Sequence, residues 1–136
     1  HTSRGCAFGD FDNDGDMDVA VVNMNEPPSL LRNDVSSGGH WLKVLLVGVT
    51  SNRSAIGARV TARYQNRTHA QEVMAQASFY SANDRRLHFG LGAATSADLT
   101  IRWPNGAIEN LERVEADQLI MVREGSGIQH RQKFGK

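Results

Sequence analysis

Apolar and polar residues alternate along much of this chain with the two-residue period that is typical of β-strands. Residues 58–64 show it best, because small and apolar side chains alternate there with Arg59, Thr61 and Arg63. This alternation indicates a strand with one face on a core and one face in water. Strand-like runs that end at Asn, Gly, Pro or Ser clusters cover residues 41–49, 57–64, 68–75, 87–91 and 99–103. Five such runs at short spacing predict an all-β domain, either an antiparallel β-sandwich or a barrel-like fold.

Turn signals divide the second half of this region into hairpins. Residues 65–68 are typical of a hairpin turn, and Trp-Pro-Asn-Gly at 103–106 is a stronger signal because Asn-Gly readily adopts positive φ. The last strands are expected at 108–111 and 119–122. The segment 108–118 also suits one face of a helix, so both interpretations stay open there. Residues 126–136 are polar and basic, and we expect them to form a flexible tail.

The first 40 residues follow a different pattern. An acidic loop leads into the apolar run at 19–22, which predicts a strand, and Leu30 and Leu31 suit a short further strand. Pro27 and Pro28 interrupt regular structure, and a Ser/Gly-rich stretch follows. The predicted organisation is therefore a strand fragment with its loop at 1–34, a linker at 35–40, a β-domain at 41–125 and the tail.

Composition limits the classes of function. The 136 residues, 40% of them apolar, suffice for one packed domain or for one domain with a fragment, which excludes an enzyme with separate cofactor and substrate domains. The longest apolar run is too short to span a bilayer, so no membrane insertion is expected. Residues 1–34 carry a net charge of −5 and the remainder +5. The basic excess is spread out, which disfavours nucleic acid as a partner.

Candidate metal chemistry is concentrated in the acidic loop. Aspartates occupy positions 1, 3, 5, 7 and 9 of a nine-residue segment with glycine at position 6: Asp10, Asp12, Asp14, Asp16 and Asp18, with Gly15. Calcium needs six to eight oxygen ligands, and a short loop supplies them by turning alternate carboxylates inward. We expect Ca²⁺ to bind the side chains of Asp10, Asp12, Asp14 and Asp18 and the backbone carbonyl of Asp16. Position 12 is Val21 where an EF-hand needs Glu, so the loop is not an EF-hand. The alternative is a solvated acidic turn.

Other candidate sites are weaker. The histidines are dispersed and no hydrolase or phosphate-binding motif is complete, so we expect no enzymatic activity. Arg59 and Arg102 could hold an acidic ligand, although exposure on the wet face of a strand is the simpler explanation. Phe79 and Tyr80 fall in a predicted loop and could stack on sugar rings. Trp41 and Trp103 adjoin apolar strands and are expected in the core.

Two families resemble parts of the chain. Residues 8–19, Phe-Gly-Asp-Phe-Asp-Asn-Asp-Gly-Asp-Met-Asp-Val, resemble the FG-GAP (VCBS) repeat, whose calcium loop joins two strands of a β-propeller blade. Residues 40–113 resemble the ASPIC/UnbV domain through four ordered blocks, which are His-Trp-Leu-Lys-Val at 40–44, Ile-Gly-Ala-Arg-Val at 56–60, His-Phe-Gly-Leu-Gly at 88–92 and Ile-Arg-Trp-Pro-Asn-Gly at 101–106. This pairing is similar to the cartilage acidic protein-like family, and it implies a secreted or surface-associated protein without catalytic activity.

The hypothesis that follows is a non-catalytic calcium-binding module for adhesion or scaffolding, located outside the cell, at the cell surface or in the periplasm. It would bind an unidentified protein partner. The alternative is a carbohydrate-binding module of a larger secreted protein, with a glycan as its partner. Strand edges without blade partners also predict a strand-mediated homodimer of this chain.

Overall fold

A computed structural model describes residues 2–35, 38–76 and 81–134. Over these ranges the chain forms eleven strands and no helix, and hence no helix long and apolar enough to cross a membrane. The predicted all-β class is confirmed. The first three strands are β1 (Ser3–Gly9), β2 (Asp18–Asn23) and β3 (Ser29–Leu31). The others are β4 (His40–Val47), β5 (Arg59–Tyr64), β6 (Arg67–Glu72), β7 (Leu87–Gly92), β8 (Ser96–Arg102), β9 (Ile108–Glu115), β10 (Gln118–Arg123) and β11 (Gly127–Lys133).

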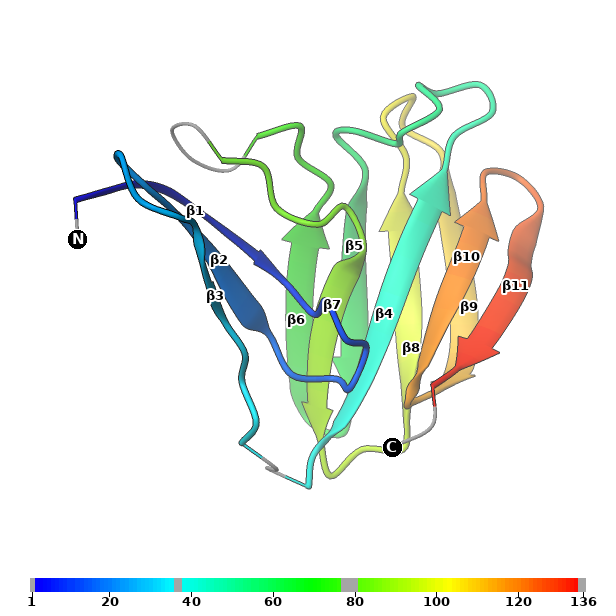
Figure 1. Cartoon of the computed structure of the whole chain (residues 1–136). Coiled ribbons are helices and arrows are strands. Elements are labelled where there is room, and N and C mark those ends of the chain that lie inside the picture. Colours follow the sequence, from blue (N-terminus) through cyan, green and yellow to red (C-terminus); the bar gives the residue numbers. More distant parts are fainter. Residues whose placement is uncertain (1, 36–37, 77–80, 135–136) are drawn as a thin grey trace.

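The strands form three sheets (Figure 1). Two four-stranded sheets, with the orders β11-β10-β4-β7 and β6-β5-β8-β9, pack face to face as a β-sandwich. In the described part of the chain neither of them closes, so the structure supports the sandwich and not the barrel-like alternative. Strands β1, β2 and β3 make a separate antiparallel sheet beside the sandwich. The acidic loop, residues 10–17, joins β1 to β2 and lies in front of β7 and β4.

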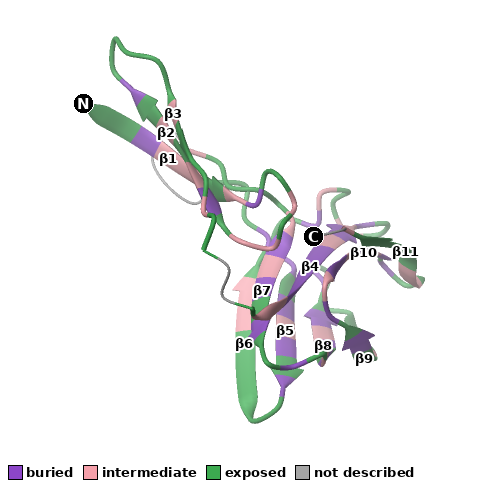
Figure 2. Cartoon of the chain, turned by 60° about the horizontal axis from the view of Figure 1, so that its bottom comes forward, coloured by how far each residue is buried: buried purple, intermediate pink, exposed green. Residues whose placement is uncertain are grey.

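The core lies between the two four-stranded sheets, as the buried bands of Figure 2 show. Alternation places one set of side chains of β4 in this core, and Leu42, Val44 and Leu46 are all buried there. Phe89 of β7 and Ile120 of β10 are also fully buried. Burying a side chain of this size contributes roughly 1.5–3 kcal/mol, so this core is the main stabilising feature of the chain.

The three-stranded sheet is apolar on both faces, unlike a sheet with one wet face. Register puts Ala20, Val22 and Leu30 on one face, and Phe8 and Leu31 on the other. Val22, Leu30 and Leu31 are each more than half exposed. Sheets with apolar residues on both faces are normally covered on both sides. The exposed surface of β1–β3 therefore has the composition of an interface.

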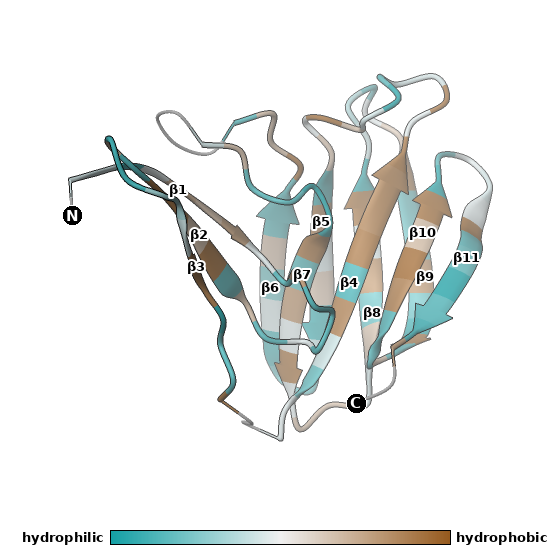
Figure 3. Cartoon of the chain, in the orientation of Figure 1, coloured by the Kyte–Doolittle hydropathy of each residue, from teal (hydrophilic) through white to brown (hydrophobic). Residues whose placement is uncertain are grey.

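The structure corrects two predictions and decides a third that the sequence left open. Residues 127–133 form β11, an edge strand paired with β10, and are not a flexible tail. Figure 3 shows this strand as mostly hydrophilic. Backbone hydrogen bonds to β10 and the packing of Ile128 against the core hold it in place. Strand β10 pairs with β4 in parallel, so this sheet is mixed, whereas side-chain alternation carries no information on strand direction. The strand expected at 108–111 is confirmed, since residues 108–115 form β9, and the alternative helix at 108–118 is wrong.

The turn after β4 is fixed by one buried carboxylate. Glu124 Oε2 accepts backbone N–H bonds from Val49, Thr50 and Ser51 at 2.7–3.0 Å. Its Oε1 accepts from the hydroxyls of Thr50 and Ser51 and from the Asn105 amide at 2.7–2.9 Å. Burial would raise the pKa of the Glu124 carboxyl, but the hydrogen bonds from Ser51, Val49 and Thr50 outweigh burial and lower its pKa to about 2. Glu124 thus joins the end of β10 to two turns.

Candidate metal centre

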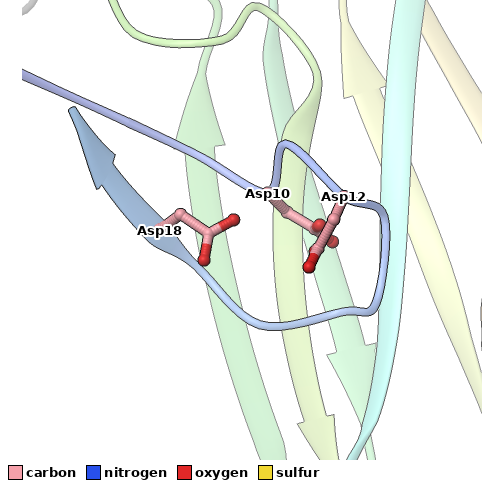
Figure 4. Close-up of side chains that lie close together, drawn as sticks. All are labelled: Asp10, Asp12 and Asp18. Carbon is pink, nitrogen blue, oxygen red and sulfur yellow. The ribbon is translucent and has the colours of Figure 1, made fainter. Parts of the chain in front are cut away.

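Three aspartates of the acidic loop come together at its base. Asp10, Asp12 and Asp18 each offer a carboxylate oxygen, and these oxygens lie within 4.8 Å of one another. Figure 4 shows the three side chains turned toward a shared space between the end of β1, the loop and the start of β2. Asp10 and Asp18 are buried, with 1% and 2% of their surface exposed, while Asp12 is exposed. Three carboxylates in this arrangement supply the hard oxygen donors that calcium prefers.

Backbone N–H groups orient these carboxylates. Asp18 Oδ2 accepts from Phe11 N at 3.0 Å, and its Oδ1 accepts from Asn33 N at 2.8 Å. Asp10 Oδ2 accepts from Gly15 N at 2.9 Å. The loop can turn this sharply because Gly15 has a φ of 100°, in the region that favours glycine. Charged acceptors held by several N–H groups are preorganised for a cation.

Asp10 leaves one oxygen without a partner. Its Oδ1 is buried and accepts no hydrogen bond from any residue that the structure describes. A buried ionised oxygen of this kind is costly unless a cation or a donor satisfies it. The carboxylate cluster and this orphaned oxygen together fit a divalent cation. Once bound, the ion would supply charge neutralisation and hold the base of the loop together.

The structure brings together some of the five predicted ligands. Asp14 and Asp16 are not part of the described three-carboxylate group, and Asp14 Oδ1 instead accepts the N–H of Asp16 at 2.9 Å. Ligation through the Asp16 carbonyl stays a prediction. The pattern of alternate aspartates thus identified the loop in which three carboxylates meet, and metal binding by this loop stays a prediction.

The underside of the loop rests on the sandwich. Trp41 and Lys43 belong to β4, and because they alternate with Leu42 and Val44 they face away from the core. Trp41 is nevertheless buried, and it packs closely against Gly15 instead of lying in the core as its apolar neighbours predicted. Trp103 does lie in the core. Acidic loop and sandwich therefore share a packed contact that no sequence pattern indicated.

Lys43 and Arg86 are the basic residues that sequence reasoning missed. Lys43 Nζ lies 2.6 Å from Asp10 Oδ2, and both side chains are almost completely buried. Arg86 Nη1 donates to Asn13 Oδ1 at 2.9 Å, and its Nη2 bonds Asp84 at 2.6 Å. A lysine inside the apolar run 41–49 was the one available signal. The partners of Lys43 lie in a loop about thirty residues away in the sequence. The alternation of residues within one strand does not indicate such a distant contact.

His88 lies beside this lysine on the neighbouring strand. Its ring stacks on Trp41 with centroids 6.0 Å apart, and it is the cross-strand partner of Lys43. Burial lowers the pKa of His88, and the positive charge of Lys43 lowers it further. The imidazole is therefore neutral at neutral pH and adds no second positive charge under the loop.

A pocket of about 500 Å³ opens between β1, the acidic loop and the strands β6 and β7. Phe8 and Met17 line it from the loop side, and Val73, Met74 and Leu87 line it from the sandwich. Asp10, Lys43 and His88 also contribute to its wall. The candidate metal group therefore borders a cavity and is not enclosed within the sandwich.

The predicted ligand-binding residues lie elsewhere. Arg59 and Arg102 are exposed cross-strand partners on β5 and β8, with Glu72 of β6 opposite Arg59 on the other side. The structure thus brings the two arginines together, on the sheet that does not carry Trp41 and Lys43. Phe79 and Tyr80 fall outside the described residues, and the stacking of sugars on them stays a prediction.

Comparison with known proteins bears on the sandwich. A sequence model of the family described as ASPIC and UnbV matches residues 48–129. The matched range begins directly after β4 and ends within β11, so the acidic loop and Lys43 lie before it. A search of curated proteins gives no match.

Proposed function

Since this chain belongs to the ASPIC and UnbV family, we propose that it is a non-catalytic module that binds Ca²⁺ and serves adhesion or scaffolding outside the cell, at the cell surface or in the periplasm. The observation that carries the calcium assignment is the carboxylate group of Asp10, Asp12 and Asp18 with its one unpartnered buried oxygen. In this proposal the metal stabilises the loop and the β-strands present the surface for a partner protein.

Residues 1–34 fit a repeat of the FG-GAP type in this proposal. Support comes from the position of the carboxylates between two antiparallel strands and from the apolar residues on both faces of β1–β3. Such a sheet would pack between neighbouring sheets in a larger protein. Calcium is preferred to zinc because the three side chains of the group offer only oxygen.

The calcium proposal is tested by Asp12→Asn. Asp12 is the exposed member of the group, so its replacement removes a ligand charge with little effect on packing. At a calcium concentration about 100 times the Kd, the metal-stripped wild type should gain about 2.7 kcal/mol, or about 5–10 °C in Tm. Asp12→Asn should lose most of this shift in a thermal melt.

The matched control is Asp98→Asn on β8, an exposed aspartate of the sandwich, which should keep the full shift. Equal shifts in wild type and Asp12→Asn would place the ion elsewhere on the chain. A wild type whose Tm does not respond to calcium would reject the proposed metal site.

The exposed apolar surface of β1–β3 leads to a second expectation, which concerns self-association. We expect two copies to pair through β3 in solution, since it is one of the two edge strands of its sheet and Leu30 on it is 56% exposed. Light scattering at micromolar concentrations should show a dimer, and Leu30→Lys should dissociate it. Ile108→Lys, at a position on the edge strand β9 that is 63% exposed, should leave the dimer intact. A wild-type monomer throughout this range would contradict the expectation.

A further inference from the structure

The candidate calcium site already contains a positive charge that the sandwich supplies. Lys43 is 1% exposed, although its ammonium group is expensive to bury without partners. Its Nζ lies 2.6 Å from Asp10 Oδ2, donates to Asn13 Oδ1 at 3.0 Å and lies 3.4 Å from the Asp10 carbonyl oxygen. All three oxygens belong to the acidic loop. The Lys43 ammonium group therefore lies within the acidic loop, on the side of the loop that faces the sandwich.

Two aromatic rings fix the ammonium from the other side. The Trp41 ring centroid lies 5.3 Å from Lys43 Nζ, and the Phe134 centroid lies 5.6 Å from it. The two rings stack with centroids 6.2 Å apart. Rings at this distance attract a cation and exclude water from it. The Lys43 ammonium thus lies between the loop and the two rings, almost completely shielded from solvent.

Asp10 divides its two oxygens between different partners. Oδ2 is occupied by the Lys43 ammonium and the Gly15 N–H, whereas Oδ1 is buried without a partner among the described residues. One oxygen thus neutralises an internal cation, and the other is left for a second cation. Among the described residues of the metal group, Asp10 is the one with a buried carboxylate oxygen that has no hydrogen-bond partner.

We propose that Lys43 is a built-in cation of the calcium site, which holds the acidic loop together without metal and weakens the affinity for calcium by its charge. This inference rests on the proposed calcium function, and it identifies Lys43 as the residue that lowers the calcium affinity of the site. The three carboxylates of the group carry −3, and Lys43 offsets one of these charges at Asp10. Arg32 Nη1 also lies 3.9 Å from Asp12 Oδ2 and Arg86 Nη1 donates to Asn13 Oδ1, but Lys43 is the cation that contacts the buried Asp10 carboxylate. Calcium affinity in oxygen sites depends strongly on the charge of the ligand set.

Removing the lysine charge should have two opposite effects. Without calcium, Lys43→Met leaves the buried Asp10 carboxylate unpaired, so the variant should melt at a lower temperature than wild type. With calcium, the ion no longer competes with a neighbouring positive charge, so the Kd should fall about tenfold or more. A residue with only a packing role would lower stability and weaken calcium binding together.

The experiment measures calcium binding by titration calorimetry and Tm with and without calcium. It compares wild type, Lys43→Met and Lys43→Gln, because glutamine keeps an N–H donor for Asp10 and lacks the charge. Lys133→Met is the matched control, since Lys133 is exposed on β11 and its Nζ lies 3.4 Å from Glu115. The control should bind calcium with the wild-type Kd.

The outcomes separate the two proposals. Tighter calcium binding by both Lys43 variants supports the inference, and so does a Lys43→Met chain that folds only when calcium is added. Wild-type calcium binding with equal or weaker binding in both variants overturns the inference and leaves the calcium function standing. Binding by the variants but not by wild type rejects calcium as a ligand of the natural site and supports Lys43 as its resident cation. No binding by any of them overturns both.

Discussion

Gly15→Ala is expected to detach the acidic loop from the sandwich and to abolish the rise in Tm on adding calcium. A Cβ atom at this position would overlap the indole of Trp41 at Nε1 and Cδ1. The φ of 100° adds backbone strain for any residue with a Cβ. The Trp41 ring is itself fixed between His88, Phe134 and Lys43, so the loop must move and not the ring. The Gly15 N–H then no longer reaches Asp10, and the carboxylates separate.

Gly106→Ala is the control that separates the backbone strain of Gly15→Ala from its steric overlap with Trp41. Gly106 has a φ of 90°, but a Cβ atom added there would meet no atom within 4 Å, so alanine should cost only the left-handed backbone, roughly 1–2 kcal/mol. Gly15→Ala should cost more. It should also make tryptophan fluorescence accessible to iodide, because Trp41 loses its cover while Trp103 stays in the core. Equal behaviour of the two variants would show that the loop does not depend on its contact with Trp41.

Glu124→Gln is expected to lower the Tm at pH 7 by on the order of 5 °C, because an amide cannot accept the whole set of donors that surrounds this side chain. Three of these donors are the consecutive backbone N–H groups of 49–51. The amide nitrogen of glutamine would face either these N–H groups or the hydroxyls of Thr50 and Ser51. The turn after β4 and the turn at Asn105 would both lose their anchor.

The same carboxylate predicts a pH dependence of known sign. The pKa of Glu124 falls from about 4.5 to about 2 on folding, so its contribution to the free energy of unfolding is complete above pH 4.5 and is lost as the pH falls toward 2. The difference in Tm between wild type and Glu124→Gln should therefore shrink over this interval. Glu112→Gln, an exposed position on β9, should match wild type at every pH. A constant difference between wild type and Glu124→Gln down to pH 2 would contradict this role.

Local patterns predicted the strands well and their partners poorly. The alternation of Arg59, Thr61 and Arg63 with apolar residues identified β5 almost to its ends, because that strand has one wet face. The polar sequence of β11 carries no such signal, since an edge strand is held mainly by the backbone of its neighbour. The parallel pairing of β4 with β10 depends on the route of the chain between them. Neither property is visible within a short window of sequence.

The candidate site was predictable in part for a similar reason. Alternate aspartates around Gly15 indicated a cation loop, because clustered carboxylates at this spacing need a countercharge. The sequence could not distinguish Asp14 from Asp12 as a member of the group. Both carboxylates accept the N–H two residues further along, and only the path of the folded loop brings Asp12 close to Asp10 and Asp18. Lys43 was hidden because both faces of β4 are buried, one by the core and the other by the loop. Its partner Asp10 follows a strand of a separate sheet.

The parallel pairing of β4 with β10 also limits the order in which parts of this chain can fold during synthesis. Leu42 and Gln118 are paired although 76 positions separate them in the chain. During synthesis β4 can therefore pair with β7 first, whereas its other neighbour, β10, is made only later. Topologies with such distant pairings fold slowly, in milliseconds to seconds. The platform of Trp41 and Lys43 is completed only after Phe134 has been made. The acidic loop is therefore synthesised well before Phe134 completes the surface on which it rests.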